Sequence, residues 1–442
     1  MSKKKENTGI NISVKSFITA ILVIFALMVL TYGLTFIIPG GGIPFWKWAL
    51  SPMLVLGAEG GGMIAAILAF LLVVGGVFNS LDVRGLMGYM LDRIVARFGK
   101  VRYGLLAVVS FFFMAMGAMI GSFEECVPLV PIVVALAVQL GWDALTGIGM
   151  SLLAAGCGFA AGVCNPFTIG VAQELAGLPM FSGVWLRLLA FGLIYLLLYG
   201  FLYGYARKIE RPLETGLSQS VVQDPKMDRG LLCFASILGT GIAIILCSGF
   251  IPALQDYTMV IVAVMFLAAG ISFSLLCGMC GRDMGKQFLG GVVSILPAVL
   301  MILMASSIRY TLEEAKILDT ILHESVVLAQ KMPGWLVILF IYLIVLVMNF
   351  FIPSGSAKAF MLIPLIVPLA QVFGLSSQLC VVAFAFGDGF SNVFYPTNPA
   401  LLIALGLADV SYGDWFKWSG KFQLINLLLT SLLLLVGLWI GY

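Results

Sequence analysis

The sequence predicts an all-α polytopic membrane protein built from two inverted repeats, and three observations lead to this fold class. Hydrophobic residues make up 61% of the 442 residues and charged residues only 10%, whereas a soluble domain has about 45–50% apolar and about 25% charged residues. Long apolar runs fill nearly the whole chain, as expected of membrane spans. The second half repeats polar and proline positions of the first. This composition excludes a soluble enzyme, a nucleic-acid-binding protein and a disordered scaffold.

The chain opens with a basic segment, residues 1–15, which precedes an apolar run from about Ile18 to Ile38. This run is too long for the hydrophobic region of a signal peptide, and no small-residue cleavage site follows it. We therefore expect an uncleaved first span. The cysteines lie almost wholly within apolar runs, so disulfides are not expected. The single histidine, His323, allows no histidine metal cluster.

Two apolar stretches are about twice the length of one span, residues 102–140 and 334–373. Each is interrupted in its middle by polar residues, which favours a re-entrant hairpin with a polar tip over an ordinary pair of spans. An amphipathic stretch precedes each hairpin, near 86–98 and near 317–328, and we expect it to lie along the membrane interface. Single spans are predicted near 16–38, 60–81, 144–176, 181–207, 229–250, 257–280, 289–311, 377–408 and 414–441.

An internal repeat relates the two halves at an offset of 233 residues. The offset aligns identical residues, namely Pro131 with Pro364, Gly141 with Gly374, Asn165-Pro166 with Asn398-Pro399, and Trp185 with Trp418. It also carries the first amphipathic stretch and hairpin onto the second. The first repeat is 16–207 and the second is 257–442. Between them lie a linker, 208–228, and an unpaired span, 229–250, whose extra crossing gives the second repeat the opposite orientation. Inverted repeats are typical of secondary transporters.

Lysines and arginines gather on one predicted side, from Lys3 at the N-terminus through Lys226 in the linker to Lys421 near the end. Positive residues favour the cytoplasmic side. We therefore expect a multi-pass protein of the cytoplasmic (inner) membrane with a cytoplasmic N-terminus and linker. Re-entrant hairpins and ordinary pairs of spans give the same parity of crossings, so only the polar tips favour hairpins.

Polar backbone at membrane depth occurs only where it is buried in protein or lines a cavity. Here it occurs in two matched pairs: the hairpin tips around Ser122 and Ser356, and the breaks Cys164–Thr168 and Tyr395–Pro399 within spans 144–176 and 377–408. Proline frees a backbone carbonyl from the helix, and freed carbonyls with Ser, Thr and Asn oxygens can coordinate a cation, while helix N-termini can hold a carboxylate. The alternative is that each Asn-Pro pair is a simple kink.

Five charged residues lie in apolar surroundings: Glu124, Glu125, Glu174, Lys358 and Asp388. Each costs about 2.5–3.5 kcal/mol at a span centre, so such residues usually face a partner or a cavity. Two acidic groups at the first tip suit a cationic group, and Lys358 with open helix N-termini at the second suits a carboxylate. An amino acid carries both. The alternative is a structural Glu125–Lys358 ion pair between the tips.

Glu174 and two further charged residues are interpreted without a role in binding. Glu174 is near the predicted outer surface, where a solvated side chain is expected. Arg187 and Arg309 lie close to span ends, and we expect their side chains to reach the interface.

Motifs at these positions resemble the YfcC-type family, whose members are described as basic amino-acid antiporters and grouped with the anaerobic C4-dicarboxylate carriers. The similar motifs are Gly121-Ser-Phe-Glu-Glu-Cys-Val-Pro128, Gly162–Thr168, Phe386–Asn392 and Pro396-Thr-Asn398. The resemblance covers nearly the whole chain and implies the ion-transporter superfamily fold. This is a homodimer with a scaffold and a transport domain of two opposed hairpins and two unwound helices, which moves as an elevator.

In that superfamily, the tips and unwound segments hold substrate and sodium. By position, the resemblance puts in the site Ser122, Glu124, Glu125, Asn165, Thr168, Ser354, Ser356, Asp388, Thr397 and Asn398; Lys358 joins the substrate residues through its charge. The sodium candidates are Ser122, Asn165, Ser356, Thr397 and Asn398. One departure is that the dicarboxylate carriers suggest anionic substrates, whereas the first tip here is acidic.

We therefore expect a secondary active transporter of amino acids, basic ones such as arginine or ornithine, that works by exchange or ion coupling. The alternative of the same class is a sodium-coupled C4-dicarboxylate carrier. A channel should show a continuous polar stripe, which these spans lack, and an intramembrane enzyme needs a catalytic constellation that we do not find. The expected partners are a small-molecule substrate, the lipid bilayer and a second copy in a homodimer, with no nucleic acid. No cofactor is expected, and the coupling ion is sodium or a proton.

Overall fold

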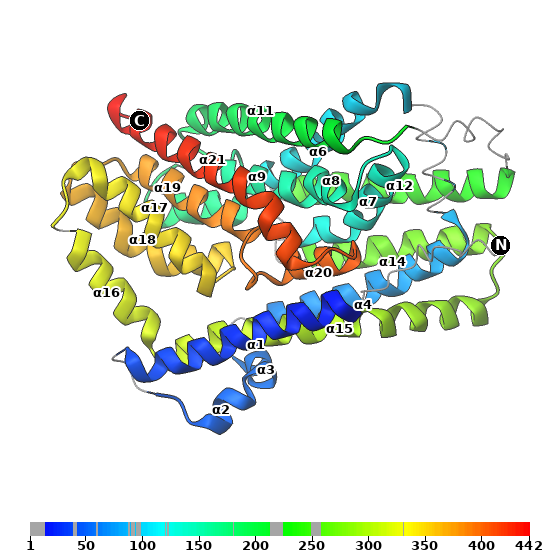
Figure 1. Cartoon of the computed structure of the whole chain (residues 1–442), viewed down its shortest axis with the longest axis horizontal. Coiled ribbons are helices and arrows are strands. Elements are labelled where there is room, and N and C mark those ends of the chain that lie inside the picture. Colours follow the sequence, from blue (N-terminus) through cyan, green and yellow to red (C-terminus); the bar gives the residue numbers. More distant parts are fainter. Residues whose placement is uncertain are drawn as a thin grey trace.

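The computed structural model describes residues 14–38, 42–58, 61–86, 89, 93, 99–119, 121, 123–179, 181–212, 224–248, 258–329 and 331–442. Every regular element among these residues is a helix (Figure 1). The predicted all-α class is therefore confirmed for the described part of the chain. Ser122, most of the first amphipathic stretch and most of the linker 208–228 lie outside it, as do the side chains of Glu124 and Glu125.

Eight helical segments in the described residues are long and apolar enough to cross a membrane. They lie in α4 (Gly61–Val83), α6 (Arg102–Met119), the continuous run Ala144–Ala161 formed by α8, a π-helical turn and α9, α11 (Val184–Ile209), α15 (Gly281–Glu314), α17 (Gly334–Phe351), α18 (Gly355–Val372) and α21 (Tyr412–Trp439). The chain is thus a multi-pass membrane protein. Helix α15 begins before the predicted span at 289, because the polar turn that holds Arg282 and Lys286 continues the helix beyond the apolar window.

One group of helices packs around α4 and α15. It also contains α1 (Val14–Ile37), α12 (Pro225–Ser248) and α14 (Thr258–Leu276), and Figure 1 shows α1, α4 and α15 running side by side. Two glycines allow α4 and α15 to cross closely, because a Cβ atom on Gly291 would lie 2.2 Å from the carbonyl oxygen of Gly75. Small residues at such crossings are usual where helices pack within membranes.

The second group contains the two split stretches and the two broken spans. Helices α6 and α7 (Val130–Gln139) form the first split stretch, and α17 and α18 form the second. The first broken span comprises α9 (Ala154–Ala161) and α10 (Val171–Leu175), and the second comprises α19 (Ser377–Asn392) and α20 (Pro399–Leu407). The packing is reciprocal: α6 packs on α9 and α17 on α19, while α10 packs on α18 and α20 on α7.

The helix breaks fall at the polar segments that the sequence singles out. Helix α6 ends at Met119 and α17 at Phe351, while α9 ends at Ala161 and α19 at Asn392. The Asn398 side chain caps α20 by accepting hydrogen bonds from the backbone N–H groups of Ala400 and Leu401. The side to which each split stretch returns, and the opposite orientation of the two halves, stay predictions.

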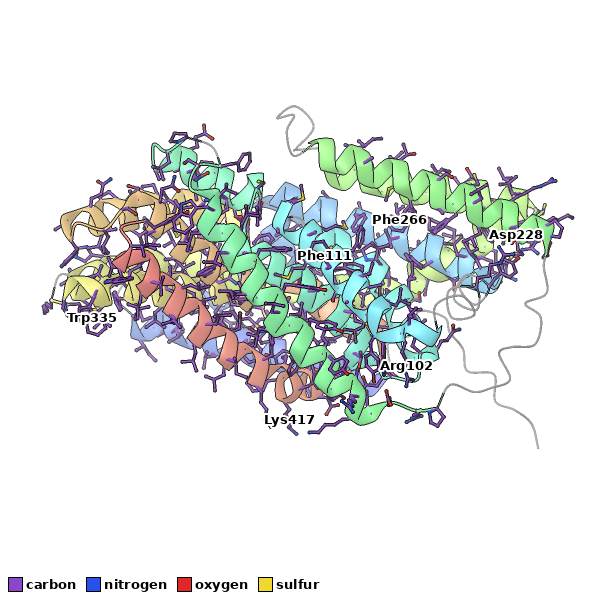
Figure 2. The ribbon with its side chains drawn as sticks, turned by 90° about the horizontal axis from the view of Figure 1, so that it is seen from above. Arg102, Phe111, Asp228, Phe266, Trp335 and Lys417 are labelled. Atoms are coloured by element: carbon purple, nitrogen blue, oxygen red, sulfur yellow. The ribbon has the colours of Figure 1, made fainter. Side chains whose placement is uncertain are left out.

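The elements predicted at the membrane interface are partly described. The second amphipathic stretch, residues 317–328, is predicted to be helical, and it lies in α16 (Ile317–Ala329). From the first stretch, Arg93 lies 2.9 Å from a carboxylate oxygen of Asp228, at the start of α12. Asp228 and Arg102 lie towards one end of the long axis and Trp335 lies at the other (Figure 2). Arg102 and Asp228, both predicted to be cytoplasmic, are therefore far from Trp335 (Figure 2).

Candidate functional site

The second tip brings a buried lysine against a buried aspartate. Lys358 belongs to the first turn of α18 and Asp388 to α19, and both residues are 0% exposed. The Lys358 ammonium lies 2.6 Å from Asp388 Oδ1 and 3.1 Å from the carbonyl oxygen of Ile352, just beyond the end of α17. It also donates to Asn349 Oδ1. Three oxygen atoms therefore surround this ammonium.

A chain of amides extends this pair to the second unwound segment. The amide nitrogen of Asn349, which has two hydrogens to donate, lies within hydrogen-bonding distance of three acceptors: the Asp388 carbonyl oxygen at 3.1 Å, Ser391 Oγ at 2.6 Å and Asn392 Oδ1 at 3.0 Å. Asn392 Oδ1 also accepts from the amide nitrogen of Asn398 at 3.0 Å. Buried polar networks with satisfied partners hold a site rigid. Here the network fixes α17, α19 and the start of α20 relative to one another.

The first tip rests directly on the first unwound segment. Gly121 has a φ of +74°, and a Cβ atom on it would lie only 1.8 Å from Asn165 Oδ1. Asn165 Oδ1 in turn accepts a hydrogen bond from the backbone N–H of Thr168 at 3.2 Å. The Cys164 N–H donates to the Ala118 carbonyl oxygen at 3.0 Å. Only glycine at position 121 permits this contact.

The second tip crosses to the first unwound segment. A Cβ atom on Gly355 would lie 2.5 Å from Thr168 Cγ2 and 2.6 Å from Asp388 Oδ2. Gly355 therefore lies between a residue of the first half and one of the second. The two tips, the first unwound segment and the Lys358–Asp388 pair thus form one continuous site.

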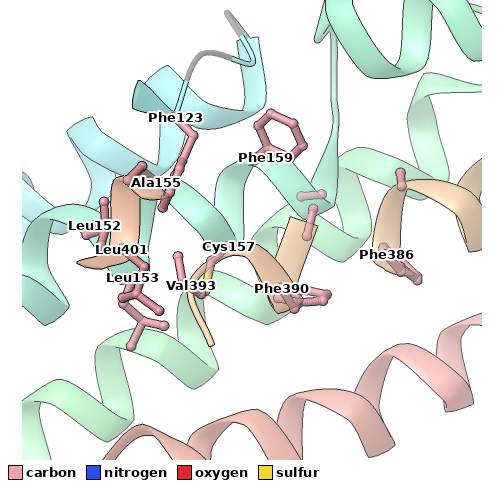
Figure 3. Close-up of a cluster of buried hydrophobic side chains, with 14 of the residues drawn as sticks. Phe123, Leu152, Leu153, Ala155, Cys157, Phe159, Phe386, Phe390, Val393 and Leu401 are labelled. Carbon is pink, nitrogen blue, oxygen red and sulfur yellow. The ribbon is translucent and has the colours of Figure 1, made fainter. Parts of the chain in front are cut away.

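Buried apolar side chains pack against the elements that form the site. Figure 3 shows Phe123, from the first tip, in one cluster with Ala155 of α9, Val393 beyond α19 and Leu401 of α20, and all four side chains are buried. Leu401 holds the position that Thr168 holds in the first half, 233 residues earlier. The two unwound segments therefore differ in polarity although both contain Asn-Pro.

Three oxygen atoms of the site are buried and have no hydrogen-bond partner among the described residues: Thr168 Oγ1, Asp388 Oδ2 and Thr397 Oγ1. Buried polar atoms in proteins are nearly always hydrogen-bonded, so these three oxygens are candidates to contact a bound ligand. Thr168 and Asp388 both contact Gly355. The site thus offers acceptors, one of them a carboxylate oxygen, to a ligand that donates hydrogen bonds.

A chain of contacts joins five of the predicted site residues. Asn165, Thr168, Lys358, Asp388 and Asn398 share the contacts given above. Ser354 is the N-cap residue of α18 but makes no side-chain capping bond, and Ser356 lies in the first turn of the same helix. The acidic tip of Glu124 and Glu125 lies outside the described side chains, so its role stays a prediction.

The role expected for Lys358 changes. Its ammonium is paired with Asp388, and its three partners among the described side chains and backbone all belong to the second half. The expected alternative, a pair with Glu125, lies outside the described side chains. Glu125 and Lys358 do hold equivalent positions in the repeat, but Lys358 extends along its own tip towards α19. Lys358 therefore does not offer an unpaired charge to a substrate carboxylate.

Arg187 corrects a second expectation, because its side chain does not reach the interface. It is 0% exposed and lies on the buried stripe of α11, with Ala190 and Ile194. Its Nη2 donates to the Phe181 carbonyl oxygen at 3.2 Å, while Nε and Nη1 have no partner among the described residues. The helical spacing of 187, 190 and 194 was the signal for burial.

Two further features were not predicted. Asn349 and Asn392 hold the amide network: Asn349 looks like an isolated polar residue in an apolar run, and Asn392 ends the Phe386–Asn392 motif but had no predicted role. A pocket of about 300 Å³ borders the network between α17, α19 and α21, lined by Tyr342, Phe390, Ser391 and Asn426 among others. Among the described residues, no group of three or more His, Cys, Asp or Glu side chains could hold a metal ion.

Comparison with known proteins gives a family match over most of the chain. Residues 51–438 match the DcuC family, described as the C4-dicarboxylate anaerobic carrier. The chain is 28% identical over 417 residues to "Putative basic amino acid antiporter YfcC" of Escherichia coli, which covers 86% of this chain and 79% of that protein. It is 25% identical over 386 residues to an uncharacterized protein of Haemophilus influenzae, covering 84% and 75% of the two chains.

Two solved structures are similar at low sequence identity. The YdaH transporter of Alcanivorax borkumensis is 18% identical with a TM-score of 0.46, and the match covers 96% of this chain and 99% of that chain. MtrF of Neisseria gonorrhoeae, described with a class of antimetabolite efflux pumps, is 15% identical with a TM-score of 0.45 and covers 94% of each chain.

Proposed function

This chain belongs to the C4-dicarboxylate anaerobic carrier (DcuC) family of membrane transporters, and from that premise we propose that it is a secondary active transporter of amino acids. Its substrate lies between the two tips and the two unwound segments. Basic amino acids are the proposed substrates, moved by exchange or ion coupling across the cytoplasmic membrane. The E. coli relative, named for basic amino acid antiport, supports this choice of substrate.

One observation carries the proposal: Asp388 Oδ2 and Thr168 Oγ1 are buried oxygens with no hydrogen-bond partner among the described residues, and both residues lie against Gly355, Asp388 through Oδ2 and Thr168 through its methyl carbon Cγ2. A protonated amine brings three donors and a positive charge, which suits a carboxylate oxygen beside a hydroxyl. A C4-dicarboxylate brings only acceptors and would meet Asp388 with like charge. We therefore place the substrate's α-amino group at Asp388 and Thr168.

The remaining groups of an amino acid have candidate partners nearby. The first turn of α18 starts at Gly355, and the free N–H groups at a helix N-terminus favour a carboxylate. The positive side chain of a basic amino acid would then face the predicted acidic tip, Glu124 and Glu125. This assignment leaves Lys358 with Asp388 Oδ1 and uses only the other oxygen of that carboxylate.

The reciprocal packing of split stretches and broken spans supports a transport mechanism of the elevator type. The helices around the site, from α6 to α11 and from α17 to α21, would form the moving domain. The helices packed around α4 and α15 would form the scaffold and hold the second copy of a homodimer. Inverted repeats with a binding site at their interface are typical of such transporters.

A sodium-coupled C4-dicarboxylate carrier is the second candidate, and Arg187 favours it. A buried guanidinium with two unpaired nitrogens suits a carboxylate. Arg187 lies in α11, which packs on α9, and its hydrogen bond goes to the Phe181 carbonyl oxygen. A single guanidinium matches only one of the two carboxylates of such a substrate, so the amino acid is the first candidate.

Purified protein in proteoliposomes tests the proposal. Vesicles loaded with unlabelled arginine should accumulate radiolabelled arginine or ornithine, and the Asp388→Asn variant should lose this exchange. An Asp409→Asn variant, at an exposed position, serves as the control and should keep it. Accumulation of radiolabelled succinate under an inward sodium gradient, with no arginine exchange, would favour the dicarboxylate carrier instead.

A further inference from the structure

The oxygen atoms around the Lys358 ammonium form the ligand set of a monovalent cation. They are a carboxylate oxygen at 2.6 Å from Asp388, a backbone carbonyl oxygen at 3.1 Å from Ile352, and the amide oxygen of Asn349. All of these residues are at most 1% exposed. Transporters commonly bind sodium with carbonyls at the C-terminal ends of broken helices. Ile352 occupies such a position, at the end of α17.

The helix that contains Lys358 does not stabilise the buried positive charge of its side chain. Lys358 lies in the first turn of α18, where the helix dipole disfavours a cation. The oxygens from α17 and α19 provide the compensation. The ammonium therefore lies in a cation cage that other elements build.

This cage belongs to the second half alone. Asn349 and Asp388 are matched in the first half, 233 residues earlier, by Met116 and Ala155. Both of these residues are buried and apolar, at 5% and 0% exposed. The shared architecture of the two halves therefore does not require the cage.

We propose that the Lys358 ammonium is a tethered cation that occupies a monovalent-cation site formed by Asp388, Asn349 and Ile352, and that this site binds Na⁺ once the ammonium is removed. The ammonium is covalently attached to the chain, so it cannot dissociate during transport. The cation site in the second half is therefore always occupied by a positive charge and needs no free sodium ion. The meaning of this site for coupling rests on the proposed transport function, but cation binding itself does not.

Three purified proteins test the proposal by their thermal unfolding in sodium chloride and in choline chloride of equal ionic strength. They are the wild type, Lys358→Ala, and Lys358→Ala with Asp388→Asn. Lys358→Ala leaves the Asp388 charge buried without a partner, which is strongly destabilising, and leaves space for an ion. Sodium should then raise the Tm of Lys358→Ala by on the order of 3 °C more than that of the wild type.

The other variants separate sodium binding from general salt effects. The double variant lacks the carboxylate charge and should respond to sodium as the wild type does. Lys358→Met fills the cage with an apolar chain and should be destabilised without rescue by sodium. Lys331→Ala removes an exposed lysine and serves as the matched control, with the response of the wild type.

Equal sodium shifts in the wild type, Lys358→Ala and the double variant would overturn the proposal. So would a Lys358→Ala protein that cannot be recovered folded in sodium, because sodium must replace the missing ammonium. No substrate enters this measurement. A failure of the cation site can thus be told apart from a failure of the proposed transport function, which the uptake assays report.

Discussion

The two tips differ in how they meet the broken spans. At the second tip, Lys358 is held by Asp388, Asn349 and the Ile352 carbonyl oxygen. At the first tip, the backbone of Gly121 lies directly against the Asn165 side chain. Both halves keep the same sequence of helix, break and Asn-Pro segment, but among the described side chains the buried ion pair at a tip occurs only in the second half. Shared architecture thus positions the site, and the asymmetric residues decide which chemistry it performs.

The largest expected effect follows from removing the Asp388 carboxylate, which pairs with Lys358 of the second tip. Asp388→Ala strands the buried Lys358 ammonium, and breaking a buried pair costs about 3–5 kcal/mol. We expect a lower free energy of unfolding by that amount and no transport. The measurement is chemical unfolding of the purified protein. Asp409→Asn, an exposed change, should stay within about 0.5 kcal/mol of the wild type; a similar small change in Asp388→Ala would show that the pair is not structurally important.

Substituting alanine for the glycine of each tip compares the contact at Gly355 with the contact at Gly121 directly. Gly355→Ala places a methyl group 2.6 Å from Asp388 Oδ2 and 2.5 Å from Thr168 Cγ2, whereas Gly121→Ala places one 1.8 Å from Asn165 Oδ1. The left-handed backbone at Gly121 adds about 1–2 kcal/mol of strain, so Gly121→Ala should be the less stable variant. Both should lower uptake on the order of 100-fold by displacing the site.

Gly200→Ala is the matched control for both tips, because nothing lies within 4 Å of a Cβ atom at that position in α11. It should leave uptake unchanged and slightly increase stability. Normal uptake in Gly355→Ala would show that the second tip does not have to lie against Thr168 and Asp388 during transport.

Replacing Arg187 should lower uptake without lowering the Tm. Arg187→Met replaces a buried charge that lacks an anionic partner in the described residues with an apolar chain of similar length, a change that is often neutral or stabilising. We expect an unchanged or higher Tm and a fall in uptake on the order of 10-fold if the guanidinium contacts the substrate carboxylate. A lower Tm with unchanged uptake would make Arg187 a structural residue only.

The smallest effect is expected at the second Asn-Pro segment. Asn398→Ala removes the cap of α20 and the bond to Asn392, and loss of such a cap costs about 1 kcal/mol. Asn398→Asp keeps the capping oxygen but loses the amide donor, so it should recover part of the stability. Thermal unfolding of both variants measures the difference, and equal stability with the wild type would return this segment to the status of a simple kink.

Much of this architecture could be predicted from the sequence, because apolar runs set the helices and Pro, Gly and Asn set their breaks. The breaks before Glu124, after Phe351, after Ala161 and after Asn392 all lie at the polar segments. Lys358 and Asp388 stood out because charges in apolar runs are rare. Their pairing could not be predicted, since it depends on which side chains face each other where α18 packs on α19, the next helix in the chain.

Other parts of the prediction went wrong or stay predictions. Arg187 is buried because α11 turns the stripe that contains it towards the core, whereas its place near a span end suggested the interface. The membrane orientation stays a prediction. Cysteine labelling should find Ser218→Cys reachable from the cytoplasm and Glu324→Cys from outside, and the reverse pattern would contradict both the orientation and the inverted repeat.

The claim that Thr168 Oγ1 and Asp388 Oδ2 receive the substrate's amino group is tested most directly by a paired change of protein and ligand. Binding of arginine, and of its analogue without the α-amino group, is measured by calorimetry on the wild type, Thr168→Val and Thr168→Ser. Thr168→Val should weaken arginine binding on the order of 10-fold and leave the analogue unchanged, while Thr168→Ser should bind both as the wild type does. An equal loss for both ligands in Thr168→Val, or a wild type that binds succinate and not arginine, would contradict the claim.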